Sequence, residues 1–335
     1  MQSRAPLTAL IILALSASIA CSSSPDELPS EPDVETAQSS WTDELIVDPH
    51  WLESRLGADD LTILHIGDPD SDAYDLWTAE PIPGQTYIAF HDIVDGTMEE
   101  GFGLPDLDAL RHRFEEAGVD DDRQIVLTGE LDGLMATRAF LSLEALGRSE
   151  GVALLDGGYF EWVIDERPTG TADDHHPSSG TLTTDDNPSI IVDAHQVQKY
   201  MEDSDYHLVD ARPYDEFSGT TPGLGISEDR AGHIPGASHY FWKHALNPSL
   251  ITTDEHPYAS YFDPEHVLFR PLTDIANDYD ELGIDDQEIL VTYCRTGVQG
   301  SFGYFLGRLL DRDVLLYDAS FVDWAADADR PVQTP

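Results

Sequence analysis

Apolar runs of four to six residues alternate with longer amphipathic segments over most of the chain. The short runs are typical of buried strands, and the longer segments, such as MATRAFLSLEALG at 135–147 and SFGYFLGRLL at 301–310, have the spacing of helices. Strands that are apolar along their whole length occur in parallel sheets that helices cover on both faces. We therefore predict an α/β fold in which parallel sheets are flanked by helices.

The pattern occurs twice, in residues 41–165 and 188–333, which look like two copies of one unit. Each copy has a strand followed by an Ile-Pro-Gly turn and, later, an acidic turn followed by tryptophan: Ile82-Pro83-Gly84 matches Ile234-Pro235-Gly236, and Asp156 to Trp162 matches Asp318 to Trp324. Residues 166–187 between the copies are rich in Pro, Gly, Ser, Thr and Asp, which is typical of a linker. We expect two tandem α/β domains.

The copies differ at the polar positions between these elements. The second copy has Asp210, Arg212, Gly232, His233 and Cys294, and the matching places in the first copy hold His65, Gly67, Glu80, Pro81 and either Gly129 or Glu130. The apolar frame is therefore kept in both copies, but we expect chemistry only in the second.

Cys294 lies between a strand-like run and a helix-like run, and the only other cysteine of the chain, Cys21, lies near the N-terminus. A thiol attacks as the thiolate, which is stabilised by a nearby cation, by backbone N–H groups and by a helix N-terminus. CRTGVQG at 294–300 offers all three, because Arg295 is adjacent, Gly297 and Gly300 let the chain curl, and a helix follows. The alternative is that Cys294 is only a small buried apolar residue.

The motifs DAR, GHIPGA and YCRTGVQGS, in that order, resemble those of the rhodanese sulfurtransferases, and the tandem arrangement is similar to that of thiosulfate and 3-mercaptopyruvate sulfurtransferases. The resemblance implies that Cys294 takes a sulfane sulfur from a small anionic donor as a persulfide and passes it to a thiophilic acceptor such as cyanide or a thiol. It also implies that the loop residues after the cysteine bind the donor: Arg295, Thr296, Gly297, Val298 and Gln299.

The donor itself is left open by two departures from the family pattern. Thr296 stands where thiosulfate-specific members commonly have lysine, and Arg295 stands where the mercaptopyruvate type has glycine. We expect thiosulfate, with 3-mercaptopyruvate as the alternative.

Three further residues near the motifs have two interpretations each. Arg212 either pairs with Asp210 or Glu216 or binds the anionic donor in the pocket, and Arg230 is a weaker candidate for the same anion site. His233 fits a rigid turn better than a proton shuttle. Trp242 and Tyr261 are expected to fill the core or the domain interface.

The charge of the chain bears on its partners. Seventeen basic residues against 65 acidic ones give a net charge of -48, which repels nucleic acid and anionic lipid surfaces. Such a surface is typical of adaptation to high salt. A small anionic donor therefore needs a local positive site.

The N-terminus reads as a targeting segment, with Arg4, an apolar run at 7–17 and SASIAC before Cys21. It resembles the lipobox of bacterial lipoproteins, although Ser18 stands where leucine is usual. We expect a signal peptide at 1–20, a lipid on Cys21 as the only membrane attachment, and an acidic tether at 21–40. The folded part would then lie in the cell envelope, on the periplasmic or extracellular side; the alternative is an ordinary secreted protein.

Competing functions are a cysteine phosphatase and a non-catalytic sulfur-binding or interaction lipoprotein. The phosphatase loop requires arginine six residues after the cysteine, and this chain has Gly300 there. His175 and His176 in the linker have no suitably spaced acidic or cysteine ligands, so we expect no metal. We also expect no cofactor and a monomeric protein.

Overall fold

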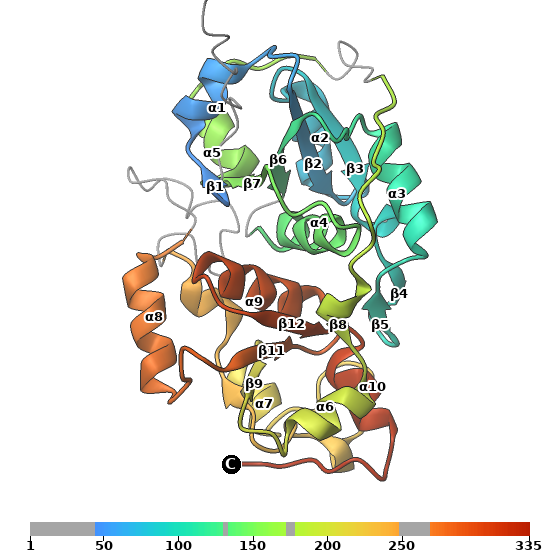
Figure 1. Cartoon of the computed structure of the whole chain (residues 1–335), viewed down its shortest axis with the longest axis vertical. Coiled ribbons are helices and arrows are strands. Elements are labelled where there is room, and N and C mark those ends of the chain that lie inside the picture. Colours follow the sequence, from blue (N-terminus) through green and yellow to red (C-terminus); the bar gives the residue numbers. More distant parts are fainter. Residues whose placement is uncertain (1–43, 130–132, 172–177, 248–268) are drawn as a thin grey trace, which may run out of the picture. The chain divides into compact units, whose positions relative to one another are not determined.

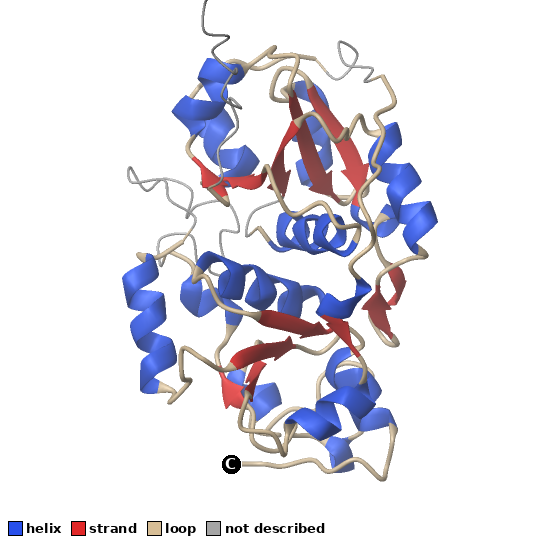
Figure 2. Cartoon of the chain, viewed as in Figure 1, coloured by secondary structure: helices blue, strands red, loops and turns tan. Residues whose placement is uncertain are grey.

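The computed structural model describes residues 44–129, 133–171, 178–247 and 269–335, which belong to one compact unit. They form two α/β domains, each built on a five-stranded parallel sheet flanked by helices (Figures 1 and 2). The predicted signal peptide, Cys21 and tether lie outside the described residues. Within the described part, no helix has the length and apolar character needed to cross a membrane.

The first sheet has the strand order β1-β7-β6-β2-β3. Its strands are β1 (Ile46–Val47), β7 (Val152–Leu155), β6 (Gln124–Gly129), β2 (Leu61–Gly67) and β3 (Gln85–Ala89). The helices of this domain are α1 (Pro49–Arg55), α2 (Asp72–Ala79), η1 (Phe90–Asp92), α3 (Leu107–Glu116), α4 (Leu134–Ala145) and α5 (Gly158–Ile164).

The second sheet has the order β10-β9-β11-β12-β8. Its strands are β10 (Ser238–His239), β9 (Tyr206–Asp210), β11 (Ile289–Tyr293), β12 (Val314–Tyr317) and β8 (Ile191–Val192). The helices are η3 (Pro188–Ile190), α6 (Ala194–Tyr200), α7 (Tyr214–Phe217), η4 (Glu228–Arg230), η5 (Trp242–Ala245), α8 (Leu272–Glu281), α9 (Val298–Leu309) and α10 (Ser320–Ala326). The predicted fold class and the internal repeat are confirmed.

Strand pairing matches the two domains residue by residue. His65 of β2 lies opposite Thr128 of β6, just as Asp210 of β9 lies opposite Tyr293 of β11. The residue that follows Thr128 is Gly129, and the residue that follows Tyr293 is Cys294. Of the two matches expected for the cysteine, the sheet register therefore selects Gly129.

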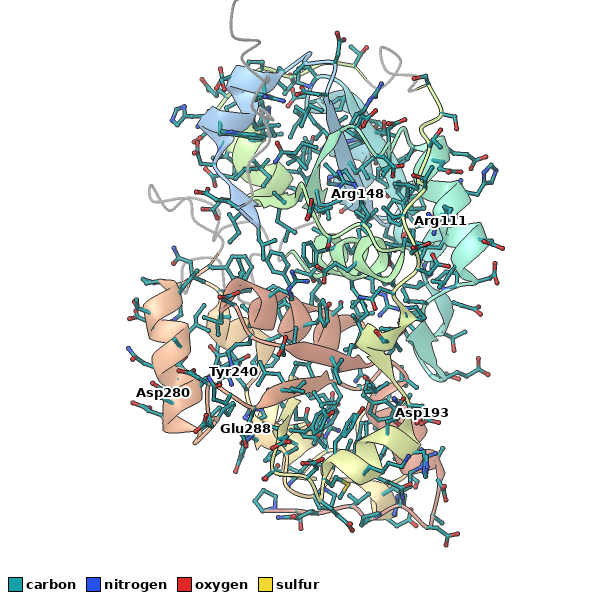
Figure 3. The ribbon with its side chains drawn as sticks, in the orientation of Figure 1. Arg111, Arg148, Asp193, Tyr240, Asp280 and Glu288 are labelled. Atoms are coloured by element: carbon teal, nitrogen blue, oxygen red, sulfur yellow. The ribbon has the colours of Figure 1, made fainter. Side chains whose placement is uncertain are left out.

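Local signals at the helix starts are repeated as well. Asp48 ends the turn after β1 and accepts hydrogen bonds from the N–H groups of His50 and Trp51. At the same place after β8, Asp193 (labelled in Figure 3) forms a capping box with Gln196. Each aspartate binds donors that the first helical turn leaves free, so both helices begin directly after a short strand.

A small hairpin leaves the first domain between β3 and α3. It consists of β4 (Asp95–Thr97) and β5 (Gly101–Gly103), which pair antiparallel (Figure 2). A side chain at Gly96 would lie 2.1 Å from the carbonyl oxygen of Gly101, so the two strands approach as closely as glycine allows. The alternation of apolar runs does not predict this element, yet it contacts the loop that follows Cys294.

The described part of the segment expected to be a linker packs along the first domain. Arg111 of α3 (labelled in Figure 3) donates to the carbonyl oxygens of Leu182 and Thr184 at 3.0 and 3.1 Å. The Leu182 side chain is buried. Residues 178–187 are therefore packed against the first domain. His175 and His176 lie outside the described residues.

Candidate active site

Cys294 follows the last residue of β11 and is only 1% exposed. Gly297, with φ of +99°, ends the loop and precedes α9. Its N–H donates to Cys294 Sγ at 3.1 Å. Gly300 lets α9 approach the sheet, since a Cβ there would lie 2.8 Å from Leu316 Cδ1. Gly297 thus gives the loop its tight curl, which aims an amide at the sulfur, and Gly300 allows the helix to pack closely on the sheet.

Two opposing effects set the ionisation of this thiol. Burial raises the pKa of Cys294 above its ordinary value, whereas the backbone N–H groups of Gly300, Thr296 and Gly297 and the Ser320 hydroxyl lower the pKa without cancelling that rise. The amide donors expected at the start of α9 are therefore in place. The Arg295 guanidinium, which was expected to act on the thiol, is instead paired with Glu216.

Ser320, which the sequence analysis missed, supports the cysteine from the next strand end. The Cys294 N–H donates to Ser320 Oγ at 3.1 Å, and that hydroxyl donates to the Tyr317 carbonyl at 2.9 Å. Ser320 has φ of +59°, a left-handed conformation that favours glycine, and its counterpart Gly158 has φ of +67°. The signal that could have found it is a serine in DASFVDW where the first copy, DGGYFEW, has glycine.

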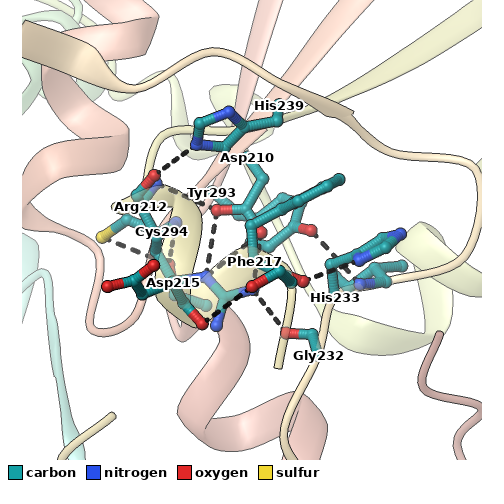
Figure 4. Close-up of polar contacts among 12 residues, drawn as sticks. Asp210, Arg212, Asp215, Phe217, Gly232, His233, His239, Tyr293 and Cys294 are labelled. Atoms are coloured by element: carbon teal, nitrogen blue, oxygen red, sulfur yellow. Dashed lines mark hydrogen bonds and ion pairs between the residues drawn. The ribbon is translucent and has the colours of Figure 1, made fainter. Parts of the chain in front are cut away.

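Arg212 lies beside Cys294 on the adjacent strand end (Figure 4). Its Nε and Nη2 donate to both oxygens of Asp210, and Nη2 also donates to the Gly232 carbonyl at 2.7 Å. Both side chains are fully buried. Burial opposes the charged form of Arg212, but Asp210 outweighs it and raises the pKa, so the guanidinium stays charged.

One nitrogen of this guanidinium is still available. Arg212 Nη1 is buried and has no hydrogen-bond partner among the residues that the structure describes. The guanidinium carbon lies 4.0 Å from the centre of the Phe321 ring, which holds it in place from the side. Both interpretations of Arg212 therefore fit the geometry: it pairs with Asp210, and it keeps one buried donor free.

The loop residues named from the sequence surround the cysteine. Arg295 Nη1 donates to Glu216 Oε1 at 3.0 Å, and this pair is largely buried. Thr296 is buried, and its carbonyl accepts a hydrogen bond from the Phe102 N–H of the hairpin at 2.8 Å. Val298 and Gln299 are partly buried in the first turn of α9. Their predicted roles in donor binding stay predictions.

Arg230 lies with the C-terminal segment. Its Nε donates to the Ala325 carbonyl at 3.1 Å, and its Nη2 donates to the carbonyls of Asp327 and Arg330 at 3.0 and 2.8 Å. These contacts tie η4 to the end of α10, and none of them involves the Cys294 loop. The geometry therefore gives Arg230 a structural role and does not bring it together with Arg212 and Arg295.

His233 and Trp242 have packing roles. His233 Nδ1 lies 2.9 Å from the Phe217 carbonyl, and its ring stacks on that of Phe217 with centroids 3.8 Å apart. Burial lowers the pKa of His233. These contacts are those of the loop-fixing residue that the turn predicts. Trp242 is buried against Phe302 as expected, and Tyr261 lies outside the described residues.

At the counterpart of this site in the first domain, the place of Cys294 is taken by a glycine that packs closely against the next helix. A Cβ at Gly129 would lie 3.1 Å from the Ala136 N and 3.3 Å from the Ala136 Cβ at the start of α4. His65, at the position of Asp210, is fully buried and lies 2.9 Å from Thr128 Oγ1. Glu130, the other match considered for Cys294, lies outside the described residues.

Comparison with known proteins assigns both domains to one family. The family described as Rhodanese-like domain matches residues 48–165 and 193–327. The chain is 27% identical to a Haloferax volcanii protein provisionally named thiosulfate sulfurtransferase, over 89% of this chain and 99% of that one. It is 26% identical to the thiosulfate sulfurtransferase of Corynebacterium glutamicum, over 87% of this chain and 91% of that one.

Two solved structures resemble the fold at low sequence identity. An anaerobic ergothioneine biosynthesis enzyme of Chlorobium limicola, with trimethyl histidine bound, superposes with a TM-score of 0.68 at 22% identity, covering 87% of this chain and 70% of that one. YnjE superposes with a TM-score of 0.70 at 22% identity, covering 87% and 68%.

The chain belongs to the rhodanese-like domain family, and its two domains are tandem members of it. The predicted family is confirmed, and the named relatives support the class of rhodanese-type sulfurtransferases.

Proposed function

We propose that the protein moves a sulfane sulfur from thiosulfate, through a persulfide on Cys294, to a thiophilic acceptor. The observation that carries the proposal is the buried thiol at the start of α9, bound by the Gly297 N–H at 3.1 Å and lined by further amides. Such a cradle stabilises a thiolate and, after sulfur uptake, an anionic persulfide.

The first half-reaction transfers one sulfur atom. The Cys294 thiolate attacks the outer sulfur of thiosulfate, a new S–S bond forms, and the S–S bond of thiosulfate breaks. Sulfite leaves with the electron pair of that bond. In the second half-reaction an acceptor such as cyanide attacks the outer persulfide sulfur, and its loss as thiocyanate returns the thiolate.

Anion binding in this scheme depends on the arginines next to the cysteine. Arg212 offers the buried Nη1 without a partner in the described structure, and Arg295 can exchange its contact with Glu216 for one with the donor. Because Cys294 is only 1% exposed, a small donor fits this site better than a bulky one. The names of the curated relatives favour thiosulfate over 3-mercaptopyruvate, which would instead lose its sulfur by breaking a C–S bond.

The decisive experiment is mass spectrometry of the intact protein after exposure to thiosulfate and, in parallel, to 3-mercaptopyruvate. We expect a gain of one sulfur atom with thiosulfate, located on the Cys294 peptide and removed by cyanide. A gain of sulfur only with 3-mercaptopyruvate would mean that this compound, and not thiosulfate, is the donor. No gain with either would leave a non-catalytic sulfur-binding or interaction role.

We also propose that the protein works outside the cytoplasm as a monomer, attached to the membrane only through a lipid on Cys21, with no nucleic-acid partner. The short apolar run, SIAC and the charge of -48 support this location and these partners. Mass spectrometry of the membrane fraction should find the mature N-terminus at a lipid-bearing Cys21. An unmodified N-terminus elsewhere would exclude the anchor.

A further inference from the structure

A carboxylate of the catalytic domain is held by the other domain. Asp318, the residue after β12, is 4% exposed and receives hydrogen bonds from Arg138 Nη1 and Nη2 at 2.5 and 3.1 Å. Its Oδ2 also accepts from the Leu104 N–H at 2.9 Å. All three donors belong to the first domain, from α4 and from the end of the hairpin.

The same carboxylate lies directly against the catalytic loop. A Cβ at Gly297 would lie 2.5 Å from the Asp318 carbonyl oxygen, 2.7 Å from Asp318 Oδ1 and 2.9 Å from the Phe102 carbonyl oxygen. The neighbouring peptide is held from the hairpin, since the Phe102 N–H donates to the Thr296 carbonyl. Gly297 is therefore enclosed between Asp318 and the first domain.

This enclosure fixes the amide that matters for the sulfur, because Gly297 is the residue whose N–H donates to Cys294 Sγ. With no room on either side, the 296–297 peptide keeps the orientation that aims this donor at the thiolate. If Asp318 were released, the peptide would gain the freedom to turn away.

The position of Arg138 itself argues for a purpose beyond packing. It is the fifth residue of α4, where α9 has the apolar Phe302, and it is fully buried among mostly apolar and small neighbours. Burying an arginine costs free energy of folding unless its charge is paired with a carboxylate and hydrogen-bonded. The first domain thus contributes a charge beside the loop that follows Cys294, next to the contact made by the hairpin.

We propose that Arg138 is a positioning residue for the Cys294 loop, acting from the first domain through Asp318 to hold the Gly297 amide toward the sulfur. This inference rests on the proposed role of Cys294 as the sulfur carrier. It names a task for the domain that has no nucleophile of its own at the matching position.

The charged groups around the loop are otherwise paired with one another. Arg212 is paired with Asp210, and Arg295 with Glu216, and these contacts are made within the second domain. We expect these pairs to stay in place when Arg138 is changed, because neither of them involves Arg138 or Asp318. A change in the titration of Cys294 in an Arg138 variant therefore reports on the amide cradle and Asp318.

The test measures the pH dependence of alkylation of Cys294 by iodoacetamide, followed on its own peptide by mass spectrometry of the full chain. For Arg138→Gln we expect the midpoint to move upward by about one pH unit, since one hydrogen bond to the thiolate is lost. Arg138→Lys should recover part of the shift because it keeps the charge near Asp318.

The matched control is Arg308→Gln, which removes another arginine whose ion pair joins the two domains. Arg308 lies at the far end of α9, is 34% exposed and contacts Glu144 of α4. We expect no shift of the midpoint in this variant. An equal shift in both variants would mean that any loosening of the domains has the same effect, and it would overturn the proposal.

Folding of the single variant is a separate matter, because Arg138→Gln leaves the Asp318 charge buried. If it does not fold, the alkylation midpoint is measured on the double variant Arg138→Gln with Asp318→Asn, which buries no unpaired charge at this pair. A folded variant of either kind with the wild-type midpoint overturns the inference. Because alkylation requires no sulfur donor, this result is distinguishable from a failure of Cys294 to accept sulfur.

Discussion

The strand ends that build the active site in the second domain are filled by packing groups in the first. Where Asp210 holds Arg212 in place, His65 lies in a cluster of aromatic rings, with centroids 5.0 Å from Tyr159 and 5.7 Å from Tyr87. Where Cys294 sits in a curled loop, Gly129 has the helix start of α4 against it. The same strand ends thus carry polar and ionisable groups in one domain and packing groups in the other.

The difference teaches that the first domain has not merely lost a cysteine. The acid–arginine pair is missing as well, because a neutral histidine, His65, stands at the place of Asp210, and Gly67 stands at the place of Arg212. Ion pairs join the domains in both directions, because Arg138 of the first domain pairs with Asp318 and Arg308 of the second pairs with Glu144, but only the first pair, together with the hairpin on Thr296, contacts the Cys294 loop among the residues described. One copy carries Cys294, and the other contacts the loop that follows it.

The largest expected effect breaks the comparison at the cysteine. Cys294→Ser should abolish sulfur transfer and leave the fold intact, because a hydroxyl neither ionises near neutral pH nor forms a persulfide. Adding Gly129→Cys to this variant should not restore transfer, since Gly67 stands at the place of Arg212 and no arginine there can bind the donor. Turnover and the mass gain after thiosulfate measure both variants, and persulfide on the Cys294→Ser protein would refute the assignment.

A second prediction concerns acid stability of the first domain. Burial lowers the pKa of His65 from its ordinary value of 6.5 to about 3, so the folded state keeps the ring neutral while the unfolded chain protonates it. The stabilising contribution is complete above pH 6.5 and is lost as the pH falls toward 3. At pH 4.5 the loss should reach about 3 kcal/mol, at about 1.4 kcal/mol per unit.

This prediction is checked by denaturant unfolding at a series of pH values. In His65→Leu, the free energy of unfolding should depend less on pH between neutral pH and pH 4.5, whatever the substitution does to stability at neutral pH. The exposed His112 is the control, and its replacement by alanine should leave the dependence unchanged. An equally steep loss in the His65→Leu protein would assign the acid sensitivity to other groups.

The third prediction tests the anion site through Arg295. Arg295→Ala should weaken thiosulfate binding by about 1.5 to 3 kcal/mol, the scale of a hydrogen bond to a charged group. Arg212→Ala is a poorer probe, because it would leave Asp210 buried and unpaired. Arg230→Ala is the matched control, since it removes the same charge away from the loop, and the apparent affinity for thiosulfate is the measurement. Equal weakening in both variants would point to overall charge.

Much of the fold could be predicted because its signals are local. The short apolar runs, the aspartate caps and the two Ile-Pro-Gly turns each depend on a few neighbouring residues. The position of Cys294 before a helix follows from the same pattern, as does the match with Gly129 once the strands are paired.

The contacts between the copies could not be predicted, because they join residues far apart in the sequence. Nothing near Arg138 announces that Asp318 is its partner, 180 residues away. The hairpin has three glycines and no apolar alternation, so its packing against Thr296 has no local signal. The nearness of Arg230 to GHIPGA makes it a weaker candidate for the anion site, and only the structure shows that its hydrogen bonds run to the C-terminal segment.

The smallest expected effect sharpens the comparison at the second strand end, where Ser320 stands in place of Gly158. Ser320→Gly introduces the residue best suited to φ of +59°, but it removes the hydroxyl that accepts the hydrogen bond from the Cys294 N–H. Losing about 1 kcal/mol of one hydrogen bond should lower kcat/KM about fivefold. Ser320→Ala also lacks the hydroxyl, but its Cβ keeps about 1 kcal/mol of backbone strain that glycine does not have. It should therefore match Ser320→Gly in activity and be less stable than that variant. Thermal unfolding and sulfur transfer measured on both variants separate the two contributions, and full activity of Ser320→Gly would show that the serine serves the turn alone.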